Sequence, residues 1–135
     1  MSFLDRLQPL GLLVMRLTLG AIMIAHGWQK IAGHLHGFMG ALSHMGIPAW
    51  MAYLVVAAEF GGGILVVVGF LTRFAAFAIL IDMLVAILKV HLHNGLTGQG
   101  GFELPLACAT ISFALIFFGA GPISIDWMRG SRSAR

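Results

Sequence analysis

The feature that most constrains this chain is a series of four apolar segments, each with about the length of a transmembrane helix. Such a helix needs about 20 mostly apolar residues. The segments span about residues 9–32, 48–70, 73–90 and 102–119, with glycine, proline, histidine and basic residues between them. The sequence therefore predicts an all-α, integral membrane four-helix bundle with an up-down-up-down path. We expect residues 1–135 to form a single domain.

Composition favours lipid over water as the solvent for the outer helix faces. Hydrophobic residues make up 59% of the 135 residues and charged residues only 10%, whereas about 25% charged residues is usual for a soluble domain. A soluble fold of this size could not cover so much apolar surface. The pI is about 9.8, but the basic residues are few and scattered, so we expect no nucleic-acid partner. The single cysteine, Cys108, excludes an internal disulfide and a cysteine-based metal site.

The distribution of positive charge predicts the orientation in the membrane. Cytoplasmic loops carry an excess of Lys and Arg. The opposite side of the predicted bundle has only Lys30 and Lys89, both near helix ends, whereas the side with the termini has Arg6, Arg73, Arg129, Arg132 and Arg135. We therefore expect both termini in the cytoplasm. A short amphipathic segment over residues 38–45 then lies at the outer surface, between the first two helices.

Four ionisable residues lie inside the apolar segments, where a charge is costly and should face the bundle interior. They are Arg16, Glu59, Asp82 and Glu103. Small residues, which let membrane helices approach closely, share the helical face of each charge: Gly20 and Gly27 with Arg16, Gly62 and Gly63 with Glu59, Ala75, Ala78 and Ala86 with Asp82, and Ala107 and Ala114 with Glu103. This pattern predicts that the four charged faces meet inside the bundle.

Depth along the helices, at about 1.5 Å per residue, divides the ionisable residues into two layers. Arg16, Glu59 and Asp82 are expected in the central and cytoplasmic half. The second layer, near the outer surface, is expected to contain His26, Lys30, Lys89, His91 and Glu103. Two interpretations stay open: a polar site for a headgroup, proton or small substrate, or structural ion pairs that fix the helix register.

The histidines of the outer layer raise the question of a metal. His26, His91 and Glu103 are all potential ligands. However, no two histidines lie four residues apart on one helix, and lysines crowd the site. We therefore expect no metal there. His26 is suited to donate a proton, since histidine titrates near neutral pH, although a histidine that bonds only a backbone carbonyl fits the sequence equally well.

Together these residues resemble the DoxX family of small bacterial membrane proteins. The order and spacing of several motifs carry the resemblance: Arg16-Leu17, His26-Gly27-Trp28-Gln29-Lys30, Ala58-Glu59-Phe60-Gly61-Gly62, Gly69-Phe70-Leu71-Thr72-Arg73, Val90-His91, Asn94-Gly95, Gly100-Gly101-Phe102-Glu103 and Gly119-Ala120-Gly121-Pro122 with Ser124 and Asp126. The resemblance implies a four-helix membrane bundle in the bacterial inner membrane. It also implies an association with redox complexes, because the family takes its name from a subunit linked to a thiosulfate:quinone oxidoreductase.

Three functional hypotheses follow. The first is a redox-linked, quinone-associated subunit that has no redox centre of its own, in which the two layers of ionisable residues bind quinone or a small redox substrate. The second is a carrier for a small solute or proton, because intramembrane carboxylates are common in carriers. The third is a non-catalytic scaffold of a larger complex. All three imply contact with the lipid bilayer, and with other subunits or further copies of this chain.

Overall fold

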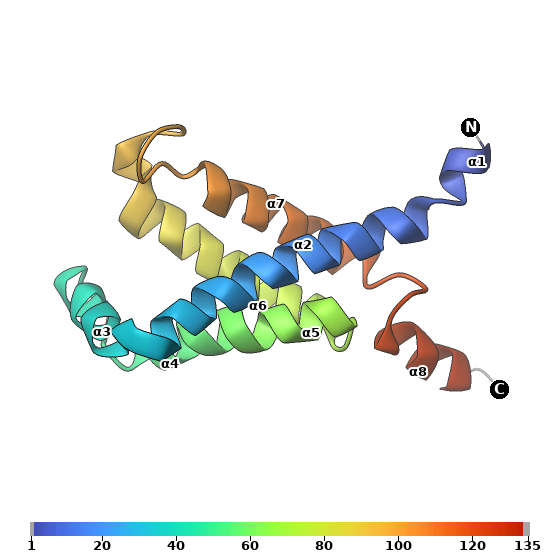
Figure 1. Ribbon diagram of the computed structural model, residues 1–135, viewed down its shortest axis with the longest axis horizontal. Coiled ribbons are helices and arrows are strands. Elements are labelled where there is room, and N and C mark those ends of the chain that lie inside the picture. Colours follow the sequence, from blue (N-terminus) through green and yellow to red (C-terminus); the bar gives the residue numbers. More distant parts are fainter. Residues whose placement is uncertain (1, 134–135) are drawn as a thin grey trace.

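The computed structural model describes residues 2–133, and all regular elements in that range are helical (Figure 1). Four main helical stretches follow one another along the chain. Short helices flank or connect them: α1 (Ser2–Asp5), α3 (Leu35–His44) and α8 (Ile125–Ser133). The main stretches are built from α2 (Gln8–Gln29) with η1 (Lys30–His34), from α4 (Met51–Val56), η2 (Ala57–Gly61) and α5 (Gly62–Val68), from α6 (Thr72–Ala86), η3 (Ile87–His91) and η4 (Leu92–Asn94), and from α7 (Glu103–Phe118).

Three helical stretches within the described residues are long and apolar enough to cross a membrane. They cover Gln8–His44, Met51–Val68 and Thr72–Asn94. The first bends near His34, where the backbone leaves helical geometry with φ of −134°, so that α3 folds away from the line of α2 (Figure 1). The fourth apolar helix, α7, has 16 residues, which is somewhat shorter than the usual span.

The core forms where α6 packs on both α7 and α5, and where α2 packs on α5. Its buried apolar side chains come from all of these helices and include Leu19, Met23, Val66, Ala76, Ile79 and Leu115. Large hydrophobic side chains such as Phe74, Phe113 and Phe117 remain exposed. An apolar exterior around a core of this kind is expected where lipid is the solvent.

Two glycines of α2 allow this helix to approach its neighbour closely. A Cβ atom at Gly20 would lie 2.8 Å from the carbonyl oxygen of Gly63, and one at Gly27 would lie 2.7 Å from the backbone nitrogen of Phe60. Such distances leave no room for a side chain. The predicted small-residue faces of the first two segments are therefore confirmed as the contact between α2 and the η2–α5 stretch.

The predicted inward face of the fourth segment is wrong. Glu103, Ala107 and Thr110 are exposed, and α7 instead buries Pro105, Cys108, Ala109, Ser112 and Leu115. Glu103 is the first residue of α7, next to the loop. Its charge is exposed there and does not have to be buried in the bundle interior. The face with Cys108, Ala109 and Ser112 also offers small side chains, and this face contacts α6.

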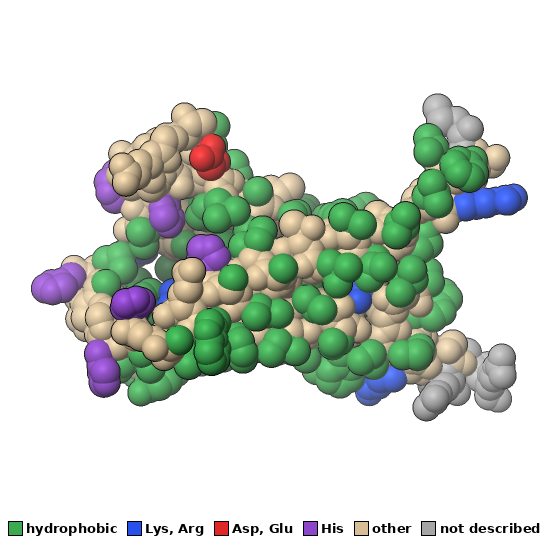
Figure 2. Space-filling model, in the orientation of Figure 1, with side chains coloured by type: hydrophobic (Ala, Val, Ile, Leu, Met, Phe, Trp, Pro, Cys, Tyr) green, Lys and Arg blue, Asp and Glu red, His purple; other side chains and the backbone are tan. Residues whose placement is uncertain are grey.

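The two ends of the molecule differ in their side chains. Both termini lie at one end, which we call the terminal end (Figure 1). The other end, with α3 and the loop over residues 95–102, is the loop end. Figure 2 shows histidines gathered at the loop end and hydrophobic side chains spread over the surface between the ends. A nonpolar surface between the two ends is the pattern of a protein embedded in a bilayer.

Candidate functional site

A cavity of about 330 Å³ lies between the helices toward the loop end. Six of the eight predicted site residues line it: His26, Lys30, Glu59, Asp82, Lys89 and His91. Most of the remaining lining is apolar and includes Met23, Phe38, Met83, Leu104 and Cys108. The structure therefore brings together residues of both predicted layers in one partly enclosed space.

Three π-helical turns supply most of the charged residues of this cavity, and α6 supplies Asp82. The turn η1 contains Lys30, η2 contains Glu59, and η3 contains Lys89 and His91. A π turn inserts one extra residue into a helical turn, and such turns occur frequently at functional sites. Three helices thus share the same irregularity where they face the same cavity. Nothing in the residue pattern of the sequence signalled these turns.

Lys30 and Glu59 form an ion pair at the centre of the site. The Nζ atom of Lys30 donates to both carboxylate oxygens of Glu59, at 2.7 Å to Oε1 and 2.5 Å to Oε2. The Glu59 side chain is 5% exposed and that of Lys30 is 21% exposed. The ammonium also lies 5.0 Å from the centre of the Phe38 ring, within cation–π range. One cation thus joins α3, η1 and η2 at the cavity wall.

Asp82 brings a second carboxyl group to this pair. Its side chain lines the same cavity as Glu59 and Lys30. The buried Oδ2 atom of Asp82 has no hydrogen-bond partner among residues 2–133. Two carboxylates and one ammonium leave a formal charge of −1, which a bound proton or a ligand that donates hydrogen bonds would offset.

His91 enters the cavity with a defined ring orientation. Its Nδ1 atom lies 2.8 Å from the carbonyl oxygen of Gly100, which also accepts a hydrogen bond from Asn94. A carbonyl can only accept, so Nδ1 carries the proton. The neutral ring therefore has its lone pair on Nε2. His26 and Lys89 are more exposed and line the same cavity.

Arg16 does not belong to this site, and the predicted layer of Arg16, Glu59 and Asp82 is wrong. Arg16 is 1% exposed and lies 14 residues before Lys30 on α2, roughly 21 Å along the helix axis. Its guanidinium group donates to four backbone carbonyl oxygens: Val66 at 2.9 Å, Val67 at 2.8 Å, Ala120 at 2.8 Å and Ile123 at 2.6 Å. Carbonyls at helix C-termini lack partners within the helix, so Arg16 satisfies the end of α5 and the turn after α7.

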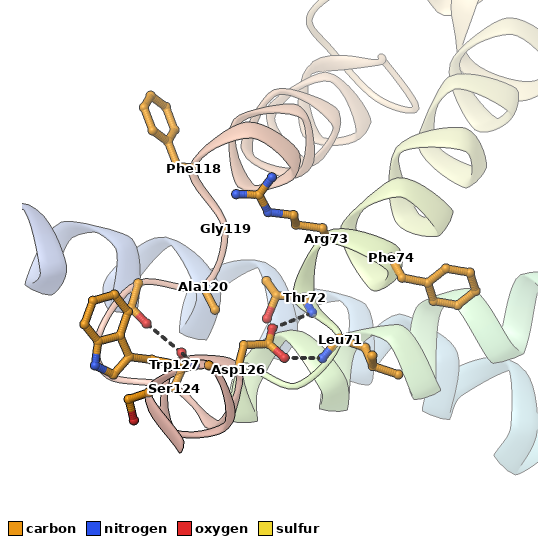
Figure 3. Close-up of a pocket in the computed structure, with 13 residues that line it drawn as sticks. Leu71, Thr72, Arg73, Phe74, Phe118, Gly119, Ala120, Ser124, Asp126 and Trp127 are labelled. Atoms are coloured by element: carbon orange, nitrogen blue, oxygen red, sulfur yellow. Dashed lines mark hydrogen bonds between the residues drawn. The ribbon is translucent and has the colours of Figure 1, made fainter. Parts of the chain in front are cut away.

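Asp126 supplies hydrogen-bond acceptors for free backbone N–H groups at the start of α6. Its carboxylate accepts hydrogen bonds from the backbone N–H groups of Leu71 and Thr72, each at 2.9 Å (Figure 3). The pKa of Asp126 lies below its ordinary value: partial burial raises it, but the hydrogen bonds from Thr72 and Leu71 and the nearby Arg129 outweigh that effect. Gly69 is required beside this contact, because it has φ of +70° and a Cβ atom there would lie 2.6 Å from the Arg16 guanidinium.

Glu103 also lies outside the cavity. It is exposed at the N-terminus of α7 and borders a separate, shallow depression with Leu96, Thr97 and Thr110. Within residues 2–133, no three His, Cys, Asp or Glu side chains are placed to hold a metal ion. The site that the structure defines is therefore a mixed apolar and ionisable cavity. Its less exposed polar groups are Lys30, Glu59, Asp82 and His91, and His26 and Lys89 are its exposed ones.

A fold of long apolar helices around an ionisable cavity defines a small helical membrane protein. The family model of DoxX matches residues 11–92, and the chain belongs to the DoxX family. It is 34% identical to "Inner membrane protein YqjF" of Escherichia coli over 91% of this chain and 95% of that protein.

Two further relatives show the range of names in this group. The chain is 32% identical to "Putative oxidoreductase CatD" of Bacillus subtilis over 78% of each sequence. It is 35% identical to an uncharacterised membrane protein of Mycobacterium tuberculosis over 70% of this chain and 61% of that protein. No solved structure matches the chain with statistical significance.

Proposed function

We propose that this protein is a redox-linked membrane subunit that binds a quinone in the cavity between α2, η2, α6 and α7. The observation that carries the proposal is the composition of that cavity, in which an apolar wall surrounds the Lys30–Glu59–Asp82 cluster. A quinone ring needs this combination, because its faces are apolar and its two oxygens form hydrogen bonds. The name of the Bacillus subtilis relative, which contains the word oxidoreductase, agrees with a redox role.

The size and position of the cavity support this proposal. A volume of about 330 Å³ lies at the lower end of the range for small-molecule sites and suits a single ring. The cavity is partly open, so an isoprenoid tail can extend into lipid. Electrons would have to pass to a partner subunit, since the quinone would be the one redox group at this site.

We further propose the orientation of the protein. Four helices cross the bacterial inner membrane in an up-down-up-down path, with the terminal end in the cytoplasm. The basic residues near the terminal end, which include Arg6, Arg73 and Arg129, support this orientation. The π turns and the cavity then lie in the outer half of the bilayer, where a membrane quinone is accessible.

Mass spectrometry of the protein purified natively in mild detergent tests the proposed function. We expect quinone in near-stoichiometric amount in the wild-type protein and in Glu103→Gln, whose carboxyl group lies outside the cavity. Lys30→Met together with Glu59→Leu should lose the quinone while the protein stays folded. If a partner protein co-purifies in a constant ratio and no quinone is found, the result would instead support the scaffold hypothesis. Proton or solute flux in liposomes that is abolished by Glu59→Gln would support a carrier.

A further inference from the structure

The hydrogen-bonding groups of the cavity are unequally divided between donors and acceptors. Lys30 is the central donor, and its ammonium is already held by both oxygens of Glu59. Asp82 adds two more acceptor oxygens, one of them buried without a partner among the described residues. The carbonyl of Gly100 fixes the proton of His91 on Nδ1, so Nε2 is a further acceptor. The other donors that line the cavity, Lys89 and His26, are exposed, and neither reaches the buried Asp82 oxygen. The buried part of the polar cluster is therefore short of donors.

The two redox forms of a quinone differ in whether they can donate hydrogen bonds. The oxidised ring has two carbonyl oxygens, which only accept hydrogen bonds. The reduced ring, a hydroquinone, has two hydroxyl groups, which donate. A buried acceptor left without a donor carries a free-energy cost, and a donor that reaches it removes this cost.

We propose that the cavity is selective for the reduced form, a hydroquinone, whose hydroxyl groups donate to Asp82 and His91. This inference rests on the proposed function and adds the redox state of the ligand that the site prefers. Tighter binding of the reduced form raises the reduction potential of the bound couple, by about 30 mV for each tenfold preference in a two-electron couple. The bound ligand is thereby made a better electron acceptor than the free quinone pool.

Equilibrium dialysis of the intact protein in detergent or nanodiscs, with ligand measured by mass spectrometry, tests the selectivity. The probes are decylubiquinone, its chemically reduced quinol under anaerobic conditions, and the dimethyl ether of that quinol. The ether keeps the ring at the reduced oxidation level but has no hydroxyl donor. We expect the quinol to bind at least about tenfold more tightly than the quinone, because a donor that reaches the buried Asp82 oxygen removes the cost of leaving it without a partner. We expect the ether to bind no better than the quinone.

Variants separate a direct contact from a general effect. Asp82→Asn replaces the carboxylate with a neutral amide. We expect it to bring the ratio of the quinone and quinol dissociation constants toward one, whereas Glu103→Gln should leave this ratio unchanged. Equal affinity of the wild-type protein for quinol and quinone would overturn the inference while leaving the proposed function intact. So would an ether that binds as tightly as the quinol. Absence of binding by every probe would overturn both.

Discussion

The ammonium group of Lys30 lies 2.5 Å from the Oε2 atom of Glu59, across the contact between two helical stretches. Each residue belongs to a π turn, η1 or η2. The neighbouring contact between Gly27 and Phe60 brings the two backbones together, so the register of α2 on η2 is set by close packing as well as by charge. The pair therefore links the cavity to the helix contact that forms it.

Loss of the Glu59 charge should destabilise the protein. Glu59→Gln leaves the Lys30 ammonium without its counter-charge, and we expect a loss of about 1–3 kcal/mol, less than for a fully buried pair because Lys30 is partly exposed. Thermal unfolding in detergent, followed by circular dichroism, measures the change. Lys30→Met combined with Glu59→Leu should recover much of the loss. A double variant less stable than Glu59→Gln would contradict this account of the pair.

Asp82→Asn should have the opposite effect on stability. An amide at this position removes one of the two carboxylates that line the cavity, and its NH₂ group adds a hydrogen-bond donor. We expect a melting temperature a few degrees above that of the wild-type protein, at the expense of ligand binding. The same unfolding measurement, carried out without added ligand, provides the comparison. A lower melting temperature would show that Asp82 has a stabilising donor in the native protein.

Arg16→Lys should destabilise the terminal end without changing the cavity. A lysine ammonium cannot reproduce the planar set of donors that reaches four carbonyl oxygens on α5 and after α7. We expect a loss of about 3–5 kcal/mol, because buried carbonyl groups would be left without donors. Quinone bound per folded protein should stay at the wild-type level. Loss of bound quinone with unchanged stability would show instead that Arg16 takes part in quinone binding.

Asp126→Asn should reveal a pH-dependent contribution to stability. The folded-state pKa of Asp126 is depressed, so its carboxylate stabilises the folded protein fully above the unfolded-state pKa of about 3.9, and this contribution disappears as the pH falls through the folded-state value. We expect the variant to be about 1 kcal/mol less stable than the wild-type protein at pH 7. The difference should vanish in acid. Unfolding curves from pH 7 down to a pH below the folded-state pKa test this, and a constant difference would argue against the carboxylate.

Much of the fold followed from the sequence because lipid imposes a simple rule on long apolar helices. Four of the five buried residues of α2 are those that the helical period predicts on one face: Arg16, Gly20, Met23 and Gly27. The same period identified Glu59, Gly62 and Gly63 on the next stretch. Six of the eight candidate site residues line one cavity for this reason. Their role in binding stays a prediction.

The depth of each charge could not be predicted from the sequence. The estimate by residue count placed Arg16 beside Glu59, whereas the close approach of Gly20 to Gly63 shifts the register and brings Lys30 to Glu59 instead. The glycines are visible in the sequence, but the residue pattern does not say which glycine of one segment faces which glycine of the other. The partners of Arg16 are backbone carbonyl oxygens. Every residue has such an oxygen, so the residue types cannot predict these contacts. The π turns likewise depend on packing. Asp126 belongs to a sequence motif, but the motif does not reveal its contact to the start of α6.

Photoaffinity labelling with an azidoquinone tests the central claim most directly, because it asks where the ligand lies. The account predicts that labelled peptides carry the modification on cavity residues such as Phe38, Met83 and Cys108, and that unlabelled quinol in excess removes it. Labelling confined to lipid-facing residues such as Phe113 and Phe117, with no competition by quinol, would contradict the proposal that this cavity is a quinone site.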